Sequence, residues 1–342
     1  GAVATREIPP NSLLCRVPGK TVWVDTDTPD IVTPKLAAKK YWSTKGFAAG
    51  GAKAGFLRLA VRLLWEKRLG SKSRWAAYIE TLPTGFEGHA THWEDEELDQ
   101  LQWPPLVSQI ALEREWLRQQ HVQLCKNIPK KVPKVSFDEF RWCVDAVRSR
   151  TFTCEGKHLV CPIADMFNHN SEERGSRFEY NGELGSYELH SGESPVKAGS
   201  EALIRYGGLS NNDLLAFYGF SVLGNKWDSL LVSLDALEAH AAQDAAEGCQ
   251  GVLEALRKFQ YVGGDGAMLR LCAGEPGAET MKLLRALALS DSLLESQSET
   301  ALAMMIGEEV EMPKEVDDNA RRLLSGFCKG QLKAFPTSIE SD

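Results

Sequence analysis

Apolar residues recur at two different spacings along the chain, and the spacings separate strand-like from helix-like segments. Short apolar runs at residues 2–6, 12–17 and 22–24 are typical of β-strands. From residue 56 the period becomes helical, with apolar side chains on one face and charged ones on the other. The apolar face carries Phe56, Leu59, Ala60, Leu63 and Leu64, and the charged face carries Arg58, Arg62 and Glu66. The pattern predicts a small β region followed by helices.

The same two spacings continue to the end of the chain. Helical spacing recurs at residues 75–79, 94–97, 110–124, 234–259, 278–289 and 318–327, and strand-like runs return at 159–161, 177–180, 186–190 and 202–206. Ser136 and Glu139 form a capping box, which predicts a helix that begins there and ends near residues 148–150. After residue 222 we expect helices alone. This order predicts an α+β fold.

Composition narrows the class of function. The chain has 342 residues, of which 43% are hydrophobic and 25% charged, and a formal charge of -8. A negative balance argues against broad binding to nucleic acid or to an anionic membrane surface. No apolar run reaches the roughly 18 residues that cross a bilayer. We therefore expect neither nucleic acid nor a membrane as partner.

The eight cysteines are scattered and include no C-x-x-C pair. Disulfide frameworks and structural zinc sites normally need short, paired spacings. We therefore expect reduced thiols, as in a cytosol-like compartment or a plastid stroma, and no metal.

Two dense polar patches are the candidates for chemistry. Residues 162–170 read PIADMFNHN, and residues 204–213 read IRYGGLSNND, followed by FYGF at 217–220. The first patch lacks the second carboxylate or histidine that a metal site would take. No G-x-S-x-G, Walker A or G-x-G-x-x-G sequence occurs. From the residues alone, a ligand site and a buried polar knot that satisfies backbone groups stay equally open.

Taken together, several segments resemble the SET-domain protein methyltransferases, in the subgroup typified by the Rubisco large-subunit lysine methyltransferase. These segments are REIP at 6–9, LLCRVP at 13–18, WAAYIETLP at 75–83, VRSRTF at 147–152, DMFNH at 165–169, YGGLSN at 206–211 and YGF at 218–220. Their order and spacing match the family over almost the whole chain.

The resemblance implies a β-rich SET core with a pseudoknot, a helical insertion, and a helical C-terminal domain on which a protein substrate docks. We expect a SET domain at residues 1–225, with its core at 1–55 and 140–225 and the insertion at about 56–139. The substrate-binding domain would span residues 226–342. We expect a monomer.

The resemblance also implies roles for individual residues. Tyr206 falls on the catalytic tyrosine of the family. Asn168, His169, Tyr206 and Phe220 would contact the methyl donor, S-adenosylmethionine. Ser149, Arg150, Asp165, Tyr180 and Tyr218 would form the channel for the target lysine.

The expected activity is protein-lysine N-methylation of a non-histone protein, with Rubisco large subunit or aldolase in the chloroplast stroma as first candidates. The cytoplasm and the nucleus are alternative locations. The alternative functions are a protein-histidine N-methyltransferase and a non-catalytic SET-fold docking module. The glycine-rich turn with which the family begins would be cut away here, with Gly1 its last residue. The substrate protein and the number of methyl groups added are not specified by the sequence.

Overall fold

A computed structural model describes residues 1–28, 52–130, 132–172, 175–244, 268–272, 278–288 and 314–335. The chain forms two compact units. The core unit comprises residues 1–94 and 109–226, and the second unit comprises residues 95–108 and 227–342. Each unit is described separately below.

The described part of the core unit contains three small sheets of three strands each. Their orders are β1-β9-β6, β2-β8-β7 and β3-β5-β4. The strands are β1 (Ala2–Val3), β2 (Leu13–Pro18), β3 (Trp23–Val24), β4 (Thr151–Cys154), β5 (Lys157–Val160), β6 (Asn168–His169), β7 (Arg177–Asn181), β8 (Ser186–His190) and β9 (Glu201–Ile204). Each sheet joins a strand from the first 24 residues to strands beyond residue 150, so the polypeptide between them is an insertion in the sheet region.

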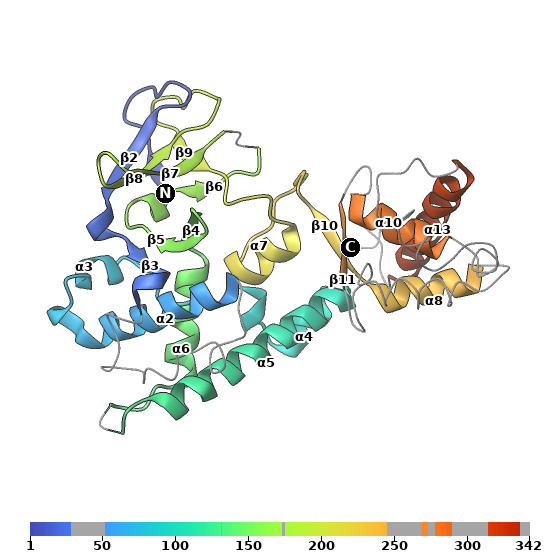
Figure 1. Ribbon diagram of the computed structural model, residues 1–342, viewed down its shortest axis with the longest axis horizontal. Coiled ribbons are helices and arrows are strands. Elements are labelled where there is room, and N and C mark those ends of the chain that lie inside the picture. The colour runs from blue at the N-terminus through green and yellow to red at the C-terminus, as the bar shows by residue number, and fades with distance from the viewer. Residues whose placement is uncertain are drawn as a thin grey trace. The chain divides into compact units, whose positions relative to one another are not determined.

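Pairing is antiparallel except between β6 and β9, where Asn168 lies opposite Leu203 and His169 opposite Ile204. This short parallel pair joins the two polar patches that the sequence singled out. Leu159, Cys161, Ala164 and Leu189 are buried in the apolar cluster between the sheets. Figure 1 shows the sheets on one side of the core unit and α2 and α6 on the other.

Helices form the remainder of the core unit: α2 (Ala52–Leu69), α3 (Ala76–Ile79), most of α5 (Pro104–Asn127), α6 (Phe137–Arg148) and α7 (Asn211–Tyr218). The capping box prediction is confirmed at the start of α6, because the Ser136 side chain accepts a hydrogen bond from the Glu139 backbone N–H. The helix ends as predicted, immediately before Ser149 and Arg150.

The charged face of α2 is buried in part, which the spacing alone did not indicate. Arg62 and Glu66 are buried, at 5% and 8% exposure. The Arg62 guanidinium lies 5.2 Å from the centre of the Trp23 ring, and Glu66 accepts a 2.6 Å hydrogen bond from Ser73. The helix is therefore enclosed by the sheet region and by α6, and Arg62 and Glu66 contact Trp23 and Ser73 inside.

The second unit contains α4 (Asp95–Asp99), β10 (Ser229–Ser233), α8 (Leu234–Asp244), β11 (Met268–Cys272), α10 (Ala278–Leu287) and α13 (Lys314–Ala334). β10 and β11 pair antiparallel over five residues each. The expectation of helices alone after residue 222 is therefore wrong for these two strands. The predicted helical residues 245–259 lie outside the described residues.

The mixed α+β class predicted from the sequence is confirmed by the structure. Over the described residues, none of the helices has the length and apolar character required to span a membrane.

Candidate functional site

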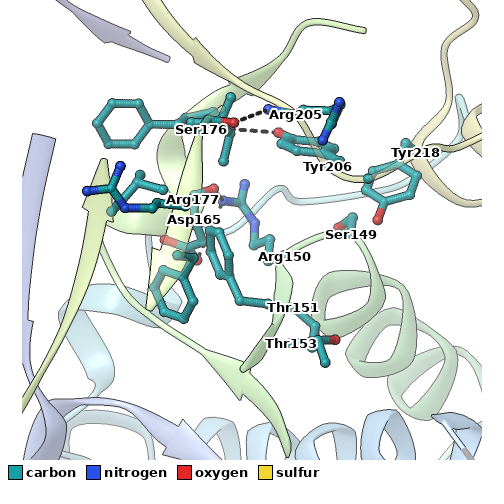
Figure 2. Close-up of a pocket in the computed structure, with 16 residues that line it drawn as sticks. Ser149, Arg150, Thr151, Thr153, Asp165, Ser176, Arg177, Arg205, Tyr206 and Tyr218 are labelled. Atoms are coloured by element: carbon teal, nitrogen blue, oxygen red, sulfur yellow. Dashed lines mark hydrogen bonds and ion pairs between the residues drawn. The ribbon is translucent and has the colours of Figure 1, made fainter. Parts of the chain in front are cut away.

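A pocket of about 290 Å³ opens in the core unit between β4, β7 and the segment after β9. We call it the arginine pocket, because Arg150, Arg177 and Arg205 all line it. Figure 2 shows these side chains together with the polar residues between them. The full lining is Ser149, Arg150, Thr151, Phe152, Thr153, Asp165, Phe167, Ser176, Arg177, Phe178, Leu189, Ile204, Arg205, Tyr206, Gly207 and Tyr218.

A second pocket, of about 430 Å³, has a different chemistry. We call it the glycine pocket, because Gly1, Gly85, Gly88 and Gly219 line it and leave backbone groups accessible. Its other lining residues are Pro83, Phe86, Glu87, His89, Ser149, Arg150, Asp165, Met166, Asn168, Tyr206, Tyr218 and Phe220. Both pockets have volumes typical of, or just below, small-molecule sites.

The two pockets share five residues: Ser149, Arg150, Asp165, Tyr206 and Tyr218. We call this set the junction. Two ligands entering from the two pockets would meet at these side chains.

The end of α6 places the first two residues of the junction. The Ser149 backbone N–H and hydroxyl both donate to the Asp145 carbonyl, at 3.0 and 2.9 Å. The Arg150 N–H donates to Val147 O at 3.1 Å, which tightens the last turn. The chain then passes directly into β4, so the carbonyls of this helix end and the two side chains are held beside both pockets.

Asp165 lies in a short 3-10 turn (Ala164–Met166) that begins after Ile163, whose φ of 77° is rarely adopted by a β-branched residue. The Tyr78 hydroxyl donates to Asp165 Oδ2 at 2.5 Å, and Arg150 Nη1 donates to the Asp165 carbonyl at 3.0 Å. Burial raises the pKa of the Asp165 carboxyl from 3.8 to about 6, although Tyr78 and Arg150 act in the opposite direction.

Tyr206 is held at both ends. Its hydroxyl donates to the Phe167 carbonyl at 2.8 Å, and its backbone N–H donates to His169 Nδ1 at 3.1 Å. Burial raises the pKa of Tyr206 to about 12. Because the hydroxyl keeps its proton and directs it to a carbonyl, the oxygen lone pairs stay available to accept hydrogen bonds from a ligand.

Tyr218 ends α7, a helix that the sequence did not predict. Gly219 follows with φ 79°, the left-handed conformation common at helix ends. A Cβ on Gly219 would lie 2.9 Å from the backbone carbon of Gly88, so glycine is required where the two segments meet. The rings of Tyr218 and Tyr206 are 5.3 Å apart, and burial raises the pKa of Tyr218 to about 12.

Asn168 and Phe220 belong to the glycine pocket alone. The Asn168 side-chain amide donates to Glu201 Oε1 at 2.8 Å, which fixes the amide against β9. The Phe220 ring lies 5.9 Å from that of His169 and 6.3 Å from that of Tyr218.

The structure therefore brings most of the predicted site residues to one place, with two exceptions. His169 lines neither pocket; it supports the Tyr206 backbone, and burial lowers its pKa, which favours the neutral ring that accepts this bond. Tyr180 is 41% exposed, packs on Tyr187 at 4.9 Å and lines neither pocket.

Sequence reasoning missed other residues of the site. Thr151, Thr153, Ser176, Arg177 and Arg205 complete the arginine pocket, and residues 85–89 of the insertion complete one wall of the glycine pocket. Tyr78 was visible only within the WAAYIETLP segment. Its link to Asp165, 87 residues away, carries no local sequence signal.

Among the described residues, Glu179, Glu188 and His190 form the one group whose ligand atoms lie close enough together for a metal ion. Cationic side chains already pair with this group. Arg16 lies 2.7 Å from Glu188 and Arg177 lies 3.4 Å from Glu179. The group is thus an internal ion-pair network on the β2-β8-β7 sheet.

No family model matches the chain. Several curated proteins are similar to the chain in sequence, and two of them illustrate the range. The chain is 28% identical to a chloroplastic [fructose-bisphosphate aldolase]-lysine N-methyltransferase of Arabidopsis thaliana, covering 100% of this chain and 70% of that protein. It is 27% identical to an actin-histidine N-methyltransferase of Gallus gallus, over 68% of this chain and 40% of that protein.

Solved structures give the same picture of the fold. The SET domain of LSMT bound to lysine and AdoHcy superposes with a TM-score of 0.72 at 21% identity, covering 99% of this chain and 75% of that one. Rubisco LSMT bound to AdoMet superposes with a TM-score of 0.69 at 21% identity, covering 99% and 76%.

Proposed function

Given that the chain is related to the SET-domain protein methyltransferases of the Rubisco LSMT type, which confirms the resemblance of its motifs, we propose that it is an S-adenosylmethionine-dependent protein-lysine N-methyltransferase. The observation that carries the proposal is the junction: two pockets of different chemistry share Ser149, Arg150, Asp165, Tyr206 and Tyr218. A transfer between two bound molecules needs such a meeting point.

The glycine pocket fits the methyl donor. Its volume of about 430 Å³ accommodates a nucleoside-sized ligand, and its glycines allow close approach to backbone groups. Asn168 offers the oxygen of a fixed amide, and Phe220 offers an aromatic face for a base. When bound, the donor supplies a sulfonium methyl carbon that an amine can attack as the carbon–sulfur bond breaks.

The arginine pocket fits the side chain of a protein substrate that reaches the junction. A free lysine has a pKa near 10.4, so its amine must lose a proton before it can act as a nucleophile. Burial of the amine beside the packed rings of Tyr206 and Tyr218 disfavours the charged form. Both hydroxyls stay protonated at neutral pH, so they orient the amine and do not take its proton.

Transfer then depends on alignment more than on a strong base. The Tyr206 oxygen, with its proton committed to Phe167, accepts from polarised C–H and N–H groups at the junction. The carbonyls of Ser149 and Arg150 are the further acceptors that we assign to the amine. His169 holds the Tyr206 backbone, and its own contact with the donor stays a prediction.

Two alternatives remain in different classes. The first alternative is a protein-histidine methyltransferase, because the chain is also similar, over a shorter stretch, to actin-histidine N-methyltransferases. Tyr218 packs directly on Tyr206, with ring centres 5.3 Å apart, and leaves less room at the junction than a smaller residue would, which favours an amine over an imidazole. A docking module without catalysis would be expected to lose Tyr206 or Asn168, and both are present.

Wider features of the protein are also proposals. We assign residues 226–342 as the substrate-docking domain, and the parallel pairing of β6 with β9 supports a pseudoknot at residues 165–170. The chloroplastic relative makes a plastid enzyme, such as aldolase or Rubisco large subunit, the first substrate to test, and the stroma the proposed location.

The test is transfer of tritium from labelled donor. The purified chain is incubated with plastid extract, with recombinant aldolase and with Rubisco large subunit, and labelled bands are sequenced by mass spectrometry. Excess S-adenosylhomocysteine serves as the inhibited control. Methyl-lysine in a labelled band supports the proposal. Methyl-histidine in a labelled band would support a protein-histidine methyltransferase instead. Absence of label despite measurable donor binding would support the docking module.

A further inference from the structure

A hydroxyl from the helical insertion, that of Tyr78, contacts Asp165 of the junction. Tyr78 belongs to α3 (Ala76–Ile79), and its ring packs edge-on against Trp23 at 5.9 Å. The Tyr78 hydroxyl donates to Asp165 Oδ2 at 2.5 Å, the short distance typical of a hydroxyl bonded to an ionised carboxylate. Sequence and pocket lining alone do not mark Tyr78, because it contacts neither pocket.

Asp165 in turn is the residue that holds Arg150. Arg150 Nη1 lies 3.0 Å from the Asp165 carbonyl and 3.8 Å from its Oδ2. The Asp165 side chain has no exposed surface, and Asp165 and Arg150 both belong to the junction. A contiguous path therefore runs from the insertion through a buried carboxylate to a cation at the junction.

We propose that Tyr78 is a positioning residue of the site: it holds the Asp165 carboxylate in its ionised form, which balances the charge of Arg150 where the two pockets meet. This rests on the proposed function. An unbalanced guanidinium would repel the sulfonium of the donor, since charges at a few ångströms interact strongly away from water. A neutral Asp165 would therefore lower turnover.

The other groups that face Asp165 keep their charge over the range from pH 5 to 8.5. Burial raises the pKa values of Cys15 to about 11 and of Tyr206 to about 12. Burial likewise holds the pKa values of Cys161 and Tyr78 above that range, and Arg150 is cationic throughout. With a pKa raised by burial to about 6, Asp165 is the group that changes charge.

The first experiment measures turnover of Tyr78→Phe relative to the unchanged protein as a function of pH. Loss of a hydrogen bond to the charged form is expected to raise the pKa of Asp165 by about one unit. The ratio of turnovers should then be close to 1 at pH 8.5 and fall to about one-fifth at pH 6. A purely structural hydroxyl would give the same ratio at every pH, and that result would overturn the proposal.

Tyr180→Phe is the matched control, because it removes a hydroxyl from an exposed tyrosine that lines neither pocket. Its ratio should stay near 1 at every pH. A fall at pH 6 equal to that of Tyr78→Phe would contradict the assignment to Tyr78.

The second experiment does not need activity. The folded pKa of Asp165 lies above its ordinary 3.8, so the stability that its neutral form contributes at low pH is lost as the pH rises through about 6. Removing the Tyr78 hydroxyl raises the pKa of Asp165 by about one unit, so in Tyr78→Phe the loss of stability continues up to about pH 7. The deficit in melting temperature of Tyr78→Phe should therefore be larger at pH 8 than at pH 5.

In an Asp165→Asn background the same deficit should not depend on pH. Equal deficits at pH 5 and 8 in the unchanged background would overturn the coupling, whether or not a substrate is known. A pH-dependent deficit with no methyl transfer to any protein would instead leave the coupling in place and count against the proposed function.

Discussion

The glycine pocket and the arginine pocket meet at five shared residues, yet they are built by different means. The glycine pocket owes its shape to backbone: Gly219 and Gly88 approach so closely that a Cβ would collide. The arginine pocket is lined by side chains with charges and hydroxyls on β4, β7 and the segment after β9. The glycine pocket therefore suits a small molecule that is the same in every reaction, and the arginine pocket suits polypeptides that present varied polar groups.

Because the two pockets are built differently, we expect variants to separate into three groups. Changes at the junction should affect turnover, changes confined to the glycine pocket should affect donor affinity, and changes confined to the arginine pocket should affect the KM of the protein substrate.

The largest effect is expected at the junction, from Tyr206→Phe. Its oxygen is assigned to the reacting groups, and removal of one such polar contact typically costs 10²–10³ in turnover. Affinity for S-adenosylhomocysteine should change by less than about twofold, because the ring remains. Single-turnover methylation and calorimetry measure the two quantities. Tyr180→Phe is the control, and near-normal turnover in Tyr206→Phe would remove Tyr206 from the chemistry.

A smaller effect is expected in the glycine pocket, from Asn168→Ala. Loss of one fixed amide contact should weaken donor binding by about tenfold, which is the order of a single hydrogen bond. The KM of the protein substrate should stay within about twofold. Calorimetric titration with S-adenosylhomocysteine measures the loss. An unchanged dissociation constant would mean that the donor does not use Asn168.

The smallest effect is expected in the arginine pocket, from Arg177→Ala. The Arg177 side chain is 45% exposed, and exposed charge contacts contribute up to about 1 kcal/mol. The KM for the protein substrate should rise by about threefold and the rise should shrink at high salt, whereas donor affinity stays constant. Arg177→Lys keeps the charge and should recover part of the effect. A change in donor affinity in Arg177→Ala would contradict the assignment of the two pockets to different ligands.

The fold followed the sequence where structure is local. The start of α6 at Ser136, the strand at residues 186–190 and the chain order of the polar patches were all predicted. The strands β10 and β11 were not predicted, because their pairing joins residues that are at least 35 positions apart, as at Ser233–Met268. The burial of Arg62 and Glu66 could not be predicted, since a pattern cannot show that a helix is covered on all sides.

The candidate site divides in the same way. Tyr206, Tyr218 and the residues at 149–150 and 165–169 were identified through motifs. Tyr78 was not assigned a role, because its hydrogen bond to Asp165 joins residues 87 positions apart and no local sequence pattern indicates such a contact. Tyr180 was assigned to the channel, but β7 turns its side chain toward Tyr187 and the surface.

The central claim is that the two pockets hold different ligands that meet at the junction. A crystal structure of the chain with S-adenosylhomocysteine and free lysine tests it most directly. We expect the adenosyl group in the glycine pocket beside Asn168 and Phe220, and the lysine amine at Tyr206, approached through the arginine pocket. S-adenosylhomocysteine bound in the arginine pocket, or lysine entering through the glycine pocket, would contradict the claim.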